Sequence, residues 1–338
     1  ANSGCANACT GQRGIKDAMS MAEITAGALK INKNDVIMAS TGVIGHFLPM
    51  TKIKVGINTL TRQLKSAAAK SDSFARAIMT TDTKLKIITR QFSLGKNTVT
   101  ITGVAKGAGM ICPDMATMLC FLMTDIKINA SLFQKALKKA VDSSFNMLTV
   151  DGDMSTNDTV VILANGLAAN SLINKQNRDF SRFSHYLEEV TLELAKLIAA
   201  DGEGATKFLE VTVKNAAGFK EAKKVALTVA NSNLVKTAIF GQDPNWGRIM
   251  AAVGRSGIKV KADTIDIYLT GNGSPGTKKI KLVNNGCGSG FNEISARNIL
   301  QAKNLGIIVD LKQGKGQATI FTCDLSCEYV KINADYLT

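Results

Sequence analysis

Apolar side chains recur at every third or fourth position over three stretches of the chain, and this spacing predicts amphipathic helices that pack on a core. Residue types that begin or end helices flank the same stretches, with Asn or Ser before the start and Gly after the end. The predicted helices cover residues 131–148 with Asn129 or Ser131 as N-cap, about 184–200 before Gly202, and the segment from the Asn231/Ser232 cap to Phe240 before Gly241.

Other stretches alternate apolar and polar residues with a period of two, which is the pattern of β-strands. Residues 209–213, 225–229 and 265–269 show this pattern, and residues 318–332 also favour an extended conformation. The apolar run at 118–123 follows a Gly-rich segment and predicts a further buried strand. Because helical and strand patterns alternate along the chain, without a repeat or a low-complexity linker, we expect a mixed α/β protein.

The composition is that of a packed globular protein. Of 338 residues, 45% are hydrophobic and 20% are charged, which excludes disordered and collagen-like chains. The length suggests two domains or one two-lobed domain, since domains average ~150 residues. No apolar run reaches the ~20 residues that span a bilayer, and residues 1–4 lack the basic and apolar regions of a signal peptide. We therefore expect no membrane segment and a cytoplasmic location.

The charge balance of the chain is strongly basic. The 41 Lys and Arg residues against 27 Asp and Glu residues give a net charge of +14, which can attract nucleic acid or a small anionic substrate. Nucleic-acid binding usually combines basic blocks with aromatic side chains that stack on bases. Here the lysines are scattered and aromatic residues make up 5% of the chain. We therefore expect a solvated basic surface and no nucleic-acid partner.

Cysteine and histidine are poorly placed for metal binding or for hydrolytic catalysis. The seven cysteines form an odd set without a C-x-x-C pair, which predicts a reducing compartment and gives little support to a zinc site. The two histidines are His46 and His185, and His185 lies in a charged helical stretch, where we expect it to face solvent. A Ser-His-Asp triad is therefore disfavoured, and we expect no metal site.

A nucleophile that needs no histidine is a Thr whose own α-amino group acts as the base, and such a group exists only after a peptide bond is cut. The segment 106–119 allows this chemistry at Thr117, because its glycines and Pro113 permit a strained backbone before that residue. A Gly-rich turn that leads into the strand at 118–123 explains the same residues, and on composition alone it is the better explanation.

Seven short segments become specific when they are taken together. They are residues 2–11 (NSGCANACTG), 40–45 (STGVIG), 106–110 (KGAGM), 115–119 (MATML), 151–159 (DGDMSTNDT), 241–248 (GQDPNWGR) and 333–336 (NADY). In this order and spacing they resemble the glutamate N-acetyltransferase (ornithine acetyltransferase) family of arginine biosynthesis. The resemblance covers essentially the whole chain, and seven ordered segments make a chance similarity very remote.

The resemblance implies an α/β (α+β) fold, a layered αββα sandwich of the ornithine acetyltransferase and self-cleaving aminopeptidase type, with a smaller C-terminal lobe. It also implies that a precursor cleaves itself before a Thr, which here falls between Ala116 and Thr117. The products are then an α chain, residues 1–116, and a β chain, residues 117–338, which are expected to form a heterotetramer of two α and two β chains. The family usually has further residues upstream of residue 2, so we expect an α chain that lacks its N-terminal stretch.

The family's functional residues carry over to the matching positions of this chain. Thr117 is the implied acyl-accepting nucleophile, and Thr41 with the backbone N–H of Gly42 is the implied oxyanion hole. Lys106 suits an α-carboxylate and Glu203 suits an α-ammonium. The implied substrate-binding residues are Thr80 (with Thr81 as a near rival), Lys106, Thr117, Glu203, Asn333 and Thr338. The resemblance implies no metal and no organic cofactor.

The implied reaction is a ping-pong acetyl transfer. Thr117 takes the acetyl group from N2-acetyl-L-ornithine, releases ornithine, and passes the acetyl group to L-glutamate. The residues leave open whether acetyl-CoA is a second donor. Two alternatives also stay open: a related self-cleaving aminopeptidase or amidase with water as acceptor, and a basic nucleic-acid-binding protein without enzymatic activity.

Overall fold

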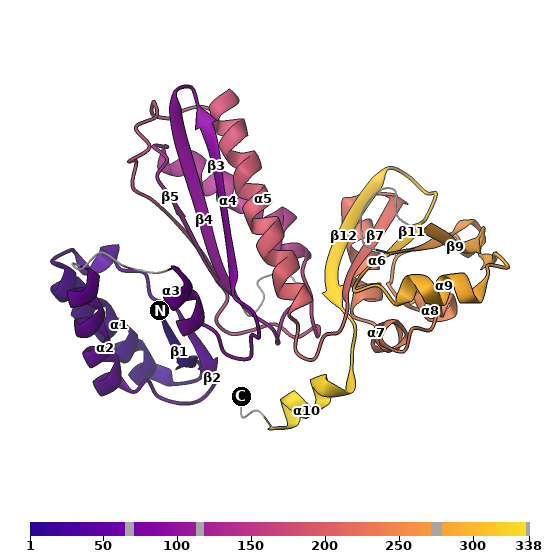
Figure 1. Cartoon of the computed structure of the whole chain (residues 1–338), viewed down its shortest axis with the longest axis horizontal. Helices are drawn as coiled ribbons and strands as arrows, with labels where there is room; N and C mark the ends of the chain where they lie inside the picture. The colour runs from indigo at the N-terminus through magenta and orange to yellow at the C-terminus, as the bar shows by residue number, and fades with distance from the viewer. Residues whose placement is uncertain (65–70, 113–117, 272–278, 336–338) are drawn as a thin grey trace.

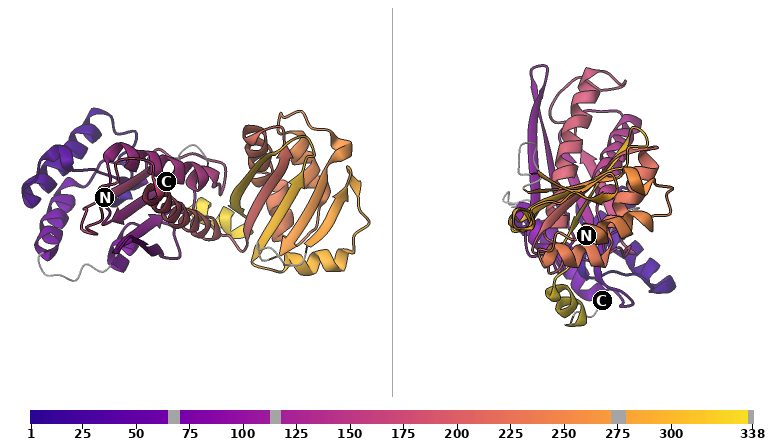
Figure 2. Two further views of the ribbon diagram at one scale, coloured as in Figure 1. Left: turned by 90° about the horizontal axis from the view of Figure 1, so that it is seen from above. Right: turned by 90° about the vertical axis from the view of Figure 1, so that its right-hand side faces the viewer.

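The computed structural model describes residues 1–64, 71–112, 118–271 and 279–335. The described strands form three sheets with helices packed beside them (Figure 1). An N-terminal region stands beside a lobe with a four-stranded sheet, and a second lobe holds a six-stranded sheet. Figure 2 shows from above that the N-terminal helices lie at one end of the molecule and the six-stranded sheet at the other.

The N-terminal region is built on two short parallel strands, with two helices packed against each other beside them. It contains β1 (Asn2–Cys5), α1 (Gly11–Leu29), a short 3-10 helix (Lys33–Asp35), β2 (Ser40–Val43) and α2 (Met50–Gln63). Gly42 has a φ of +126°, and a side chain there would collide with the backbone of Gly4 and Cys5. Glycine at this position therefore allows β1 and β2 to pair closely beside Thr41.

The first lobe contains a sheet in the order β3-β4-β5-β6, in which only β5 and β6 run parallel. Buried residues on one face of this sheet, among them Ile101 and Leu122, join the cluster that packs against α5, and α4 lies beside α5. The elements are α3 (Ser71–Ala77), β3 (Lys86–Leu94), β4 (Asn97–Lys106), β5 (Leu119–Thr124), α4 (Ala130–Ser143), a 3-10 helix (Phe145–Met147), β6 (Thr159–Ala164) and α5 (Arg178–Ala200).

The second lobe contains a sheet in the order β10-β9-β8-β11-β7-β12, in which only β7 and β11 run parallel. Helix α6 packs across β7 and β12, and α9 lies against β8. The elements are β7 (Phe208–Ala216), α6 (Phe219–Ala230), α7 (Asn233–Phe240), α8 (Trp246–Gly254), a 3-10 helix (Ala262–Thr264), β8 (Asp266–Gly271), β9 (Lys279–Asn284), β10 (Cys287–Gly288), α9 (Glu293–Leu300), β11 (Asn304–Asp310) and β12 (Gly316–Cys323).

Helix α5 connects the two lobes. The side chain of Asn177 caps its start by accepting a hydrogen bond from the N–H of Phe180 at 3.0 Å. The helix contacts β3 and β4 of the first sheet and β7 and β12 of the second, so that one hydrophobic cluster runs through both lobes. Its C-cap is Asp201, and Glu203 therefore lies where the lobes meet.

Helix α10 (Cys327–Asp335) runs from the six-stranded sheet back toward the N-terminal region (Figure 1). Side chains hold the turn that precedes it. The carboxylate of Asp324 accepts hydrogen bonds from the N–H groups of Thr206 at 2.8 Å and Lys207 at 3.0 Å, and Ser326 Oγ accepts one from the N–H of Glu328 at 3.1 Å. These bonds hold the turn between β12 and α10 against the segment that follows α5.

The predicted α/β class is confirmed by the sheets and the helices that pack against them, and a C-terminal lobe follows α5. The three predicted helices correspond to α4, α5 and α7, although α4 ends at Ser143 and α5 begins at Arg178. The predicted strands at 118–123, 209–213 and 265–269 correspond to β5, β7 and β8. None of the helices in the described ranges combines the length and the apolar character that a membrane span requires.

One sequence prediction is wrong, and another is wrong in part. Residues 225–229 belong to α6 and not to a strand, because the buried residues Ala222, Val225, Ala226 and Val229 recur at helical spacing. A five-residue apolar window is too short to separate the two periods. The prediction of extended structure over 318–332 holds for β12 and fails at α10, where the turn at Asp324 and Ser326 starts a helix.

Candidate active site

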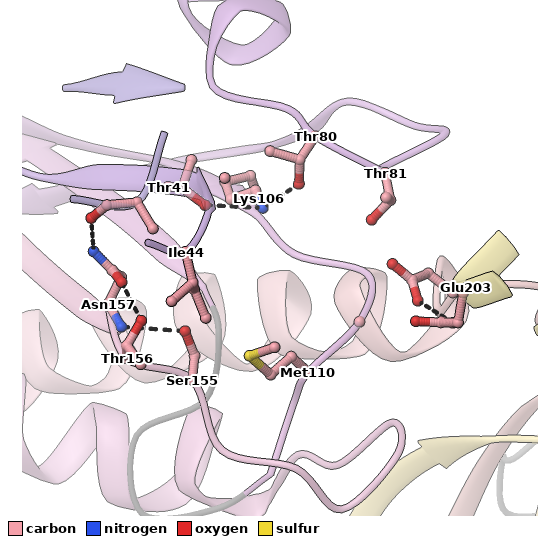
Figure 3. Close-up of a pocket in the computed structure, with 14 residues that line it drawn as sticks. Thr41, Ile44, Thr80, Thr81, Lys106, Met110, Ser155, Thr156, Asn157 and Glu203 are labelled. Atoms are coloured by element: carbon pink, nitrogen blue, oxygen red, sulfur yellow. Dashed lines mark hydrogen bonds between the residues drawn. The ribbon is translucent and has the colours of Figure 1, made fainter. Parts of the chain in front are cut away.

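A cleft lies between the N-terminal region, the end of β4, the end of α5 and helix α10 (Figure 3). It encloses about 580 Å³ of space that opens to solvent. Every described residue that the sequence predicts for catalysis or substrate binding lines this cleft: Thr41, Gly42, Thr80, Lys106, Glu203 and Asn333. The near rival Thr81 lines it as well. The fold thus gathers residues that are widely separated in the sequence.

Lys106 is the last residue of β4, and its side chain is buried at the wall of the cleft. Its ammonium donates hydrogen bonds to Thr80 Oγ1 at 2.7 Å and to Thr41 Oγ1 at 3.4 Å (Figure 3). Burial lowers the pKa of Lys106, and the carboxylate of Asp82, with Oδ2 3.8 Å from Nζ, opposes that effect. The lysine therefore presents a partly desolvated positive charge to the cleft.

A second lysine and two carboxylates lie behind Lys106. Asp82 accepts hydrogen bonds from Lys86 Nζ at 2.7 Å and from the N–H of Gly107 at 2.6 Å. Burial alone would raise the pKa of Asp82, but Lys86 and Lys106 outweigh it and hold that pKa below its usual value. Lys86 also pairs with Asp201 at 2.5 Å. Buried charges of opposite sign thus compensate one another next to the cleft.

Thr41 and Gly42, on β2, form the cleft wall next to Lys106. Thr41 is buried, and its hydroxyl oxygen lies within hydrogen-bond distance of the Lys106 ammonium. A hydroxyl beside a backbone N–H at a cleft wall is a donor pair suited to a developing oxyanion. The close β1–β2 pairing at Gly42 fixes the backbone of this pair.

Glu203 lies just beyond α5 at the far side of the cleft (Figure 3). Its N–H donates to the carbonyl oxygen of Ala108 at 2.8 Å, and Asn333 Nδ2 on α10 donates to its Oε2 at 2.8 Å. A side chain at Gly109 would occupy the place of the Glu203 carboxylate. The carboxylate is therefore held in position by several segments and can pair with a cation in the cleft.

The start of β5 lies next to Lys106, because Leu119 pairs with Lys106 in the β4–β5 ladder. The N–H of Met118 donates to Asp158 Oδ1 at 2.9 Å, and burial raises the pKa of Asp158 to about 6 against the effect of that bond. Met118 is the first described residue after the predicted cleavage point. The predicted site residues Ala116, Thr117 and Thr338 lie outside the described residues.

Several cleft residues were not singled out from the sequence. They are Ala6, Ile44, Gly109, Met110, Ser155, Thr156 and Asn157. Asn157 Nδ2 donates to the carbonyl oxygen of Ala6 at 2.6 Å and so ties the loop before β6 to the N-terminal region. Each of these residues belongs to a segment that carries the family resemblance, and that membership could have identified them as site residues. Asp82 lies in none of those segments, and only its contacts mark it.

The cysteines and histidines of the described ranges neither form a metal site nor line the cleft. Within the described ranges, no three His, Cys, Asp or Glu side chains are grouped as a metal ion requires. None of the seven cysteines forms a disulfide, and all seven fall within the described ranges. His185 is exposed on α5 and lies 3.3 Å from Glu189, which confirms the prediction of a solvent-facing side chain.

Comparisons with known proteins match the whole chain. The profile of the ArgJ family matches residues 1–338. The arginine biosynthesis bifunctional protein ArgJ of Caldanaerobacter subterraneus subsp. tengcongensis is 49% identical over 337 residues, covering 100% of this chain and 82% of that protein. Its counterpart from Geobacter sulfurreducens is 48% identical over 338 residues, covering 100% of this chain and 84% of that protein.

A solved structure agrees with these sequence matches. The crystal structure of arginine biosynthesis bifunctional protein argJ from Bacillus halodurans superposes with a TM-score of 0.60 at 43% identity. The superposition covers 64% of this chain and 98% of the crystallised chain. Together with the cleft described above, these similarities over the full length lead to one conclusion: the chain belongs to the ArgJ family, whose members are acyltransferases of arginine biosynthesis.

Proposed function

We propose that this protein is an ornithine acetyltransferase, which moves the acetyl group of N2-acetyl-L-ornithine to L-glutamate through Thr117. The observation that carries the proposal is the convergence of Thr41, Lys106 and Glu203 on one cleft beside the start of β5. The names of the relatives, bifunctional proteins of arginine biosynthesis, support the same pathway.

The charges of the cleft match the charges of both substrates. Lys106 is a cation that can bind the α-carboxylate shared by acetylornithine and glutamate. Glu203 is a carboxylate that can bind the α-ammonium of leaving ornithine and of entering glutamate. Thr80 and Asn333 lie beside these two residues and complete the proposed binding site.

The proposed chemistry uses the free α-amino group of Thr117 as the base. This amine takes the hydroxyl proton as Oγ attacks the acetyl carbonyl, and the Thr41 hydroxyl with the Gly42 N–H stabilises the charge on the carbonyl oxygen. The C–N bond of acetylornithine then breaks, and the proton passes to the ornithine nitrogen. Glutamate attacks the acetyl-Thr ester in the reverse sense, which restores the hydroxyl.

Cleavage between Ala116 and Thr117 would supply that amine. The cut falls between β4 and β5, which pair in antiparallel register from Ile101 with Thr124 to Lys106 with Leu119. This ladder would hold an α chain, residues 1–116, and a β chain, residues 117–338, together after the cut. We propose that two of each assemble as a cytoplasmic heterotetramer.

Intact-mass measurement of the purified protein, followed by an assay with acetylornithine and glutamate, tests this function. We expect two fragments from the wild type, one uncut chain from Thr117→Ala, and acetylglutamate formation only by the wild type. Release of free acetate at the same rate without glutamate would instead identify an amidase. A parallel reaction with acetyl-CoA decides whether that donor is used. A single uncut chain with salt-sensitive DNA binding would point to the non-enzymatic alternative.

A further inference from the structure

One ammonium group touches two threonine hydroxyls in the cleft. Lys106 Nζ lies 2.7 Å from Thr80 Oγ1 and 3.4 Å from Thr41 Oγ1. An ammonium can only donate hydrogen bonds, so both hydroxyl oxygens accept from it. Each threonine has one hydroxyl proton, and that proton is then directed to another acceptor. The contact therefore makes Thr41 and Thr80 donors toward whatever anionic group enters the cleft.

The position of Lys106 depends in turn on Asp82. The Asp82 side chain is fully buried, and its Oδ2 lies 3.8 Å from Lys106 Nζ. The same carboxylate accepts hydrogen bonds from the N–H of Gly107 at 2.6 Å and from the N–H of Thr80 at 3.2 Å. Asp82 thus holds the residue after Lys106, the backbone of Thr80 and the charge of Lys106 at once.

A neighbouring carboxylate provides a comparison within the same cluster. Asp201 pairs with Lys86 at 2.5 Å and accepts hydrogen bonds from the N–H groups of Thr83 at 3.0 Å and Lys84 at 3.2 Å. Asp82 and Asp201 are both buried and share Lys86 as a partner. Of the two, Asp82 alone makes an ion pair with Lys106 in the described part of the chain.

We propose that Asp82 is a positioning residue for acetyl transfer: its carboxylate holds Lys106 and the backbone of Thr80 in place, and through Lys106 it orients the hydroxyls of Thr41 and Thr80 as donors. The inference rests on the proposed function, because it assigns these donors to acetyl transfer. It predicts that a residue with no access to the substrate controls both substrate binding and turnover.

The charged groups that influence Lys106 fix the direction of the expected pH effect. Asp82 and Glu203 favour its charged form, Lys86 opposes it, and Asp158 also lies within electrostatic reach. Since Lys106 is already easier to deprotonate than an ordinary lysine, loss of the Asp82 charge makes it lose its proton at still lower pH. An opposite charge at this range typically changes such an equilibrium by a factor of about ten or more.

The test measures kcat and KM against pH for the full-length processed enzyme and for Asp82→Asn. We expect the alkaline loss of kcat/KM to begin at least about one pH unit lower in the variant. The matched control Asp201→Asn also removes a buried partner of Lys86. We expect it to lower the melting temperature, while the alkaline limb of its pH profile of kcat/KM stays at the wild-type pH. In a second variant, Lys86→Gln, loss of the competing cation should move the alkaline limb to higher pH.

A double-mutant cycle of Asp82 and Lys106 separates an effect on orientation from a general effect on folding. If Asp82 acts through Lys106, then Asp82→Asn should change turnover little when Lys106→Met is already present. The inference would be overturned if the double variant lost turnover by the product of the two single losses. It would also be overturned if a folded Asp82→Asn or Lys86→Gln enzyme lost kcat/KM at the same alkaline pH as the wild type. A wild type without acetyl transfer would refute the proposed function itself, which is a separate result.

Discussion

Two ionic clusters of similar composition occupy different surroundings in this protein. At the wall of the cleft and behind it, Lys86 and Lys106 meet Asp82 and Asp201, and all four side chains are buried. In the six-stranded sheet, Asp266 accepts hydrogen bonds from the N–H of Asn285 at 2.8 Å and from Lys281 Nζ at 3.0 Å, and Lys312 Nζ lies 2.9 Å away. There both lysines are partly exposed.

The difference between the clusters shows how a lysine becomes available for chemistry. Lys281 and Lys312 converge on one carboxylate that also holds a turn, so this cluster stabilises the β8–β9 region. Lys106 meets its carboxylate only at 3.8 Å and turns its closer contacts toward hydroxyls at the cleft. A lysine that its counter-ion does not fully engage, yet keeps charged, can bind a substrate anion.

The largest effect should come from Thr41→Ala. Removing one oxyanion donor typically lowers turnover by a factor of about 10² to 10³. The matched control is Thr319→Ala, because Thr319 lies in the six-stranded sheet and its hydroxyl meets Thr212 Oγ1 at 2.9 Å. We expect steady-state kinetics to show a large fall in kcat for Thr41→Ala only, with little change in acetylornithine binding. Near-normal turnover would show that Thr41 is not part of the oxyanion hole.

Lys106→Met compared with Lys281→Met tests the two clusters directly. Loss of a charge-assisted hydrogen bond costs about 1.5 to 3 kcal/mol, or roughly a 10- to 150-fold fall in kcat/KM. We expect this fall in both half-reactions for Lys106→Met, because both amino acids present the same α-carboxylate, and none for Lys281→Met. Measuring acetylornithine and glutamate kinetics separately checks it. A defect confined to acetylornithine would move the carboxylate anchor to another residue.

Asp266→Asn should lower stability and leave activity unchanged, in contrast to Lys106→Met, which should lower activity. Burial would raise the pKa of Asp266, but its hydrogen bonds from Asn285, Lys312 and Lys281 outweigh this and depress the pKa. A carboxyl group with a depressed folded-state pKa stabilises the fold above its unfolded pKa, and this contribution is lost as pH falls below that value. We expect a lower melting temperature than wild type at pH 7, a difference that shrinks on acidification, and unchanged kcat. Equal melting temperatures at pH 7 would contradict this role.

The smallest effect concerns Asp158. Burial raises the pKa of its carboxyl group to about 6. A carboxyl group with a raised folded-state pKa takes up a proton on folding, so stability falls as pH rises from about 4 to about 6. Asn at this position can still accept the hydrogen bond from Met118 and carries no charge. The melting temperature of Asp158→Asn relative to wild type should therefore rise over that interval. A difference that is constant with pH would argue against the shifted pKa.

The sequence was sufficient for features with a strong local or familial pattern. The stripe of buried residues along α5 and the alternation in β7 follow from their own periods. Thr41, Lys106 and Glu203 could be placed together only through the family resemblance, since no spacing in the sequence indicates that β2, β4 and the end of α5 meet.

Other features depend on contacts between distant segments and were beyond prediction. The buried stripe of α6 resembles a strand over residues 225–229, and only its packing across β7 and β12 decides for a helix. Asp82 is an ordinary polar residue by sequence, and its role comes from Lys86, Lys106 and Gly107, which lie on β3 and at the end of β4. The start of α10 likewise depends on Asp324 bonding to residues 118 and 117 positions earlier.

The hydrogen bond between Glu203 and Asn333 spans 130 positions of the chain. On the ribosome, the first lobe and α5 are made long before α10, so a nascent chain can hold Thr41, Lys106 and Glu203 without the residue that fixes the Glu203 carboxylate. The cleft therefore reaches its final form only after the whole six-stranded sheet has been synthesised and α10 has turned back. Prematurely terminated chains would carry most of the site residues and still lack a finished pocket, which ties acetyl transfer to completed translation.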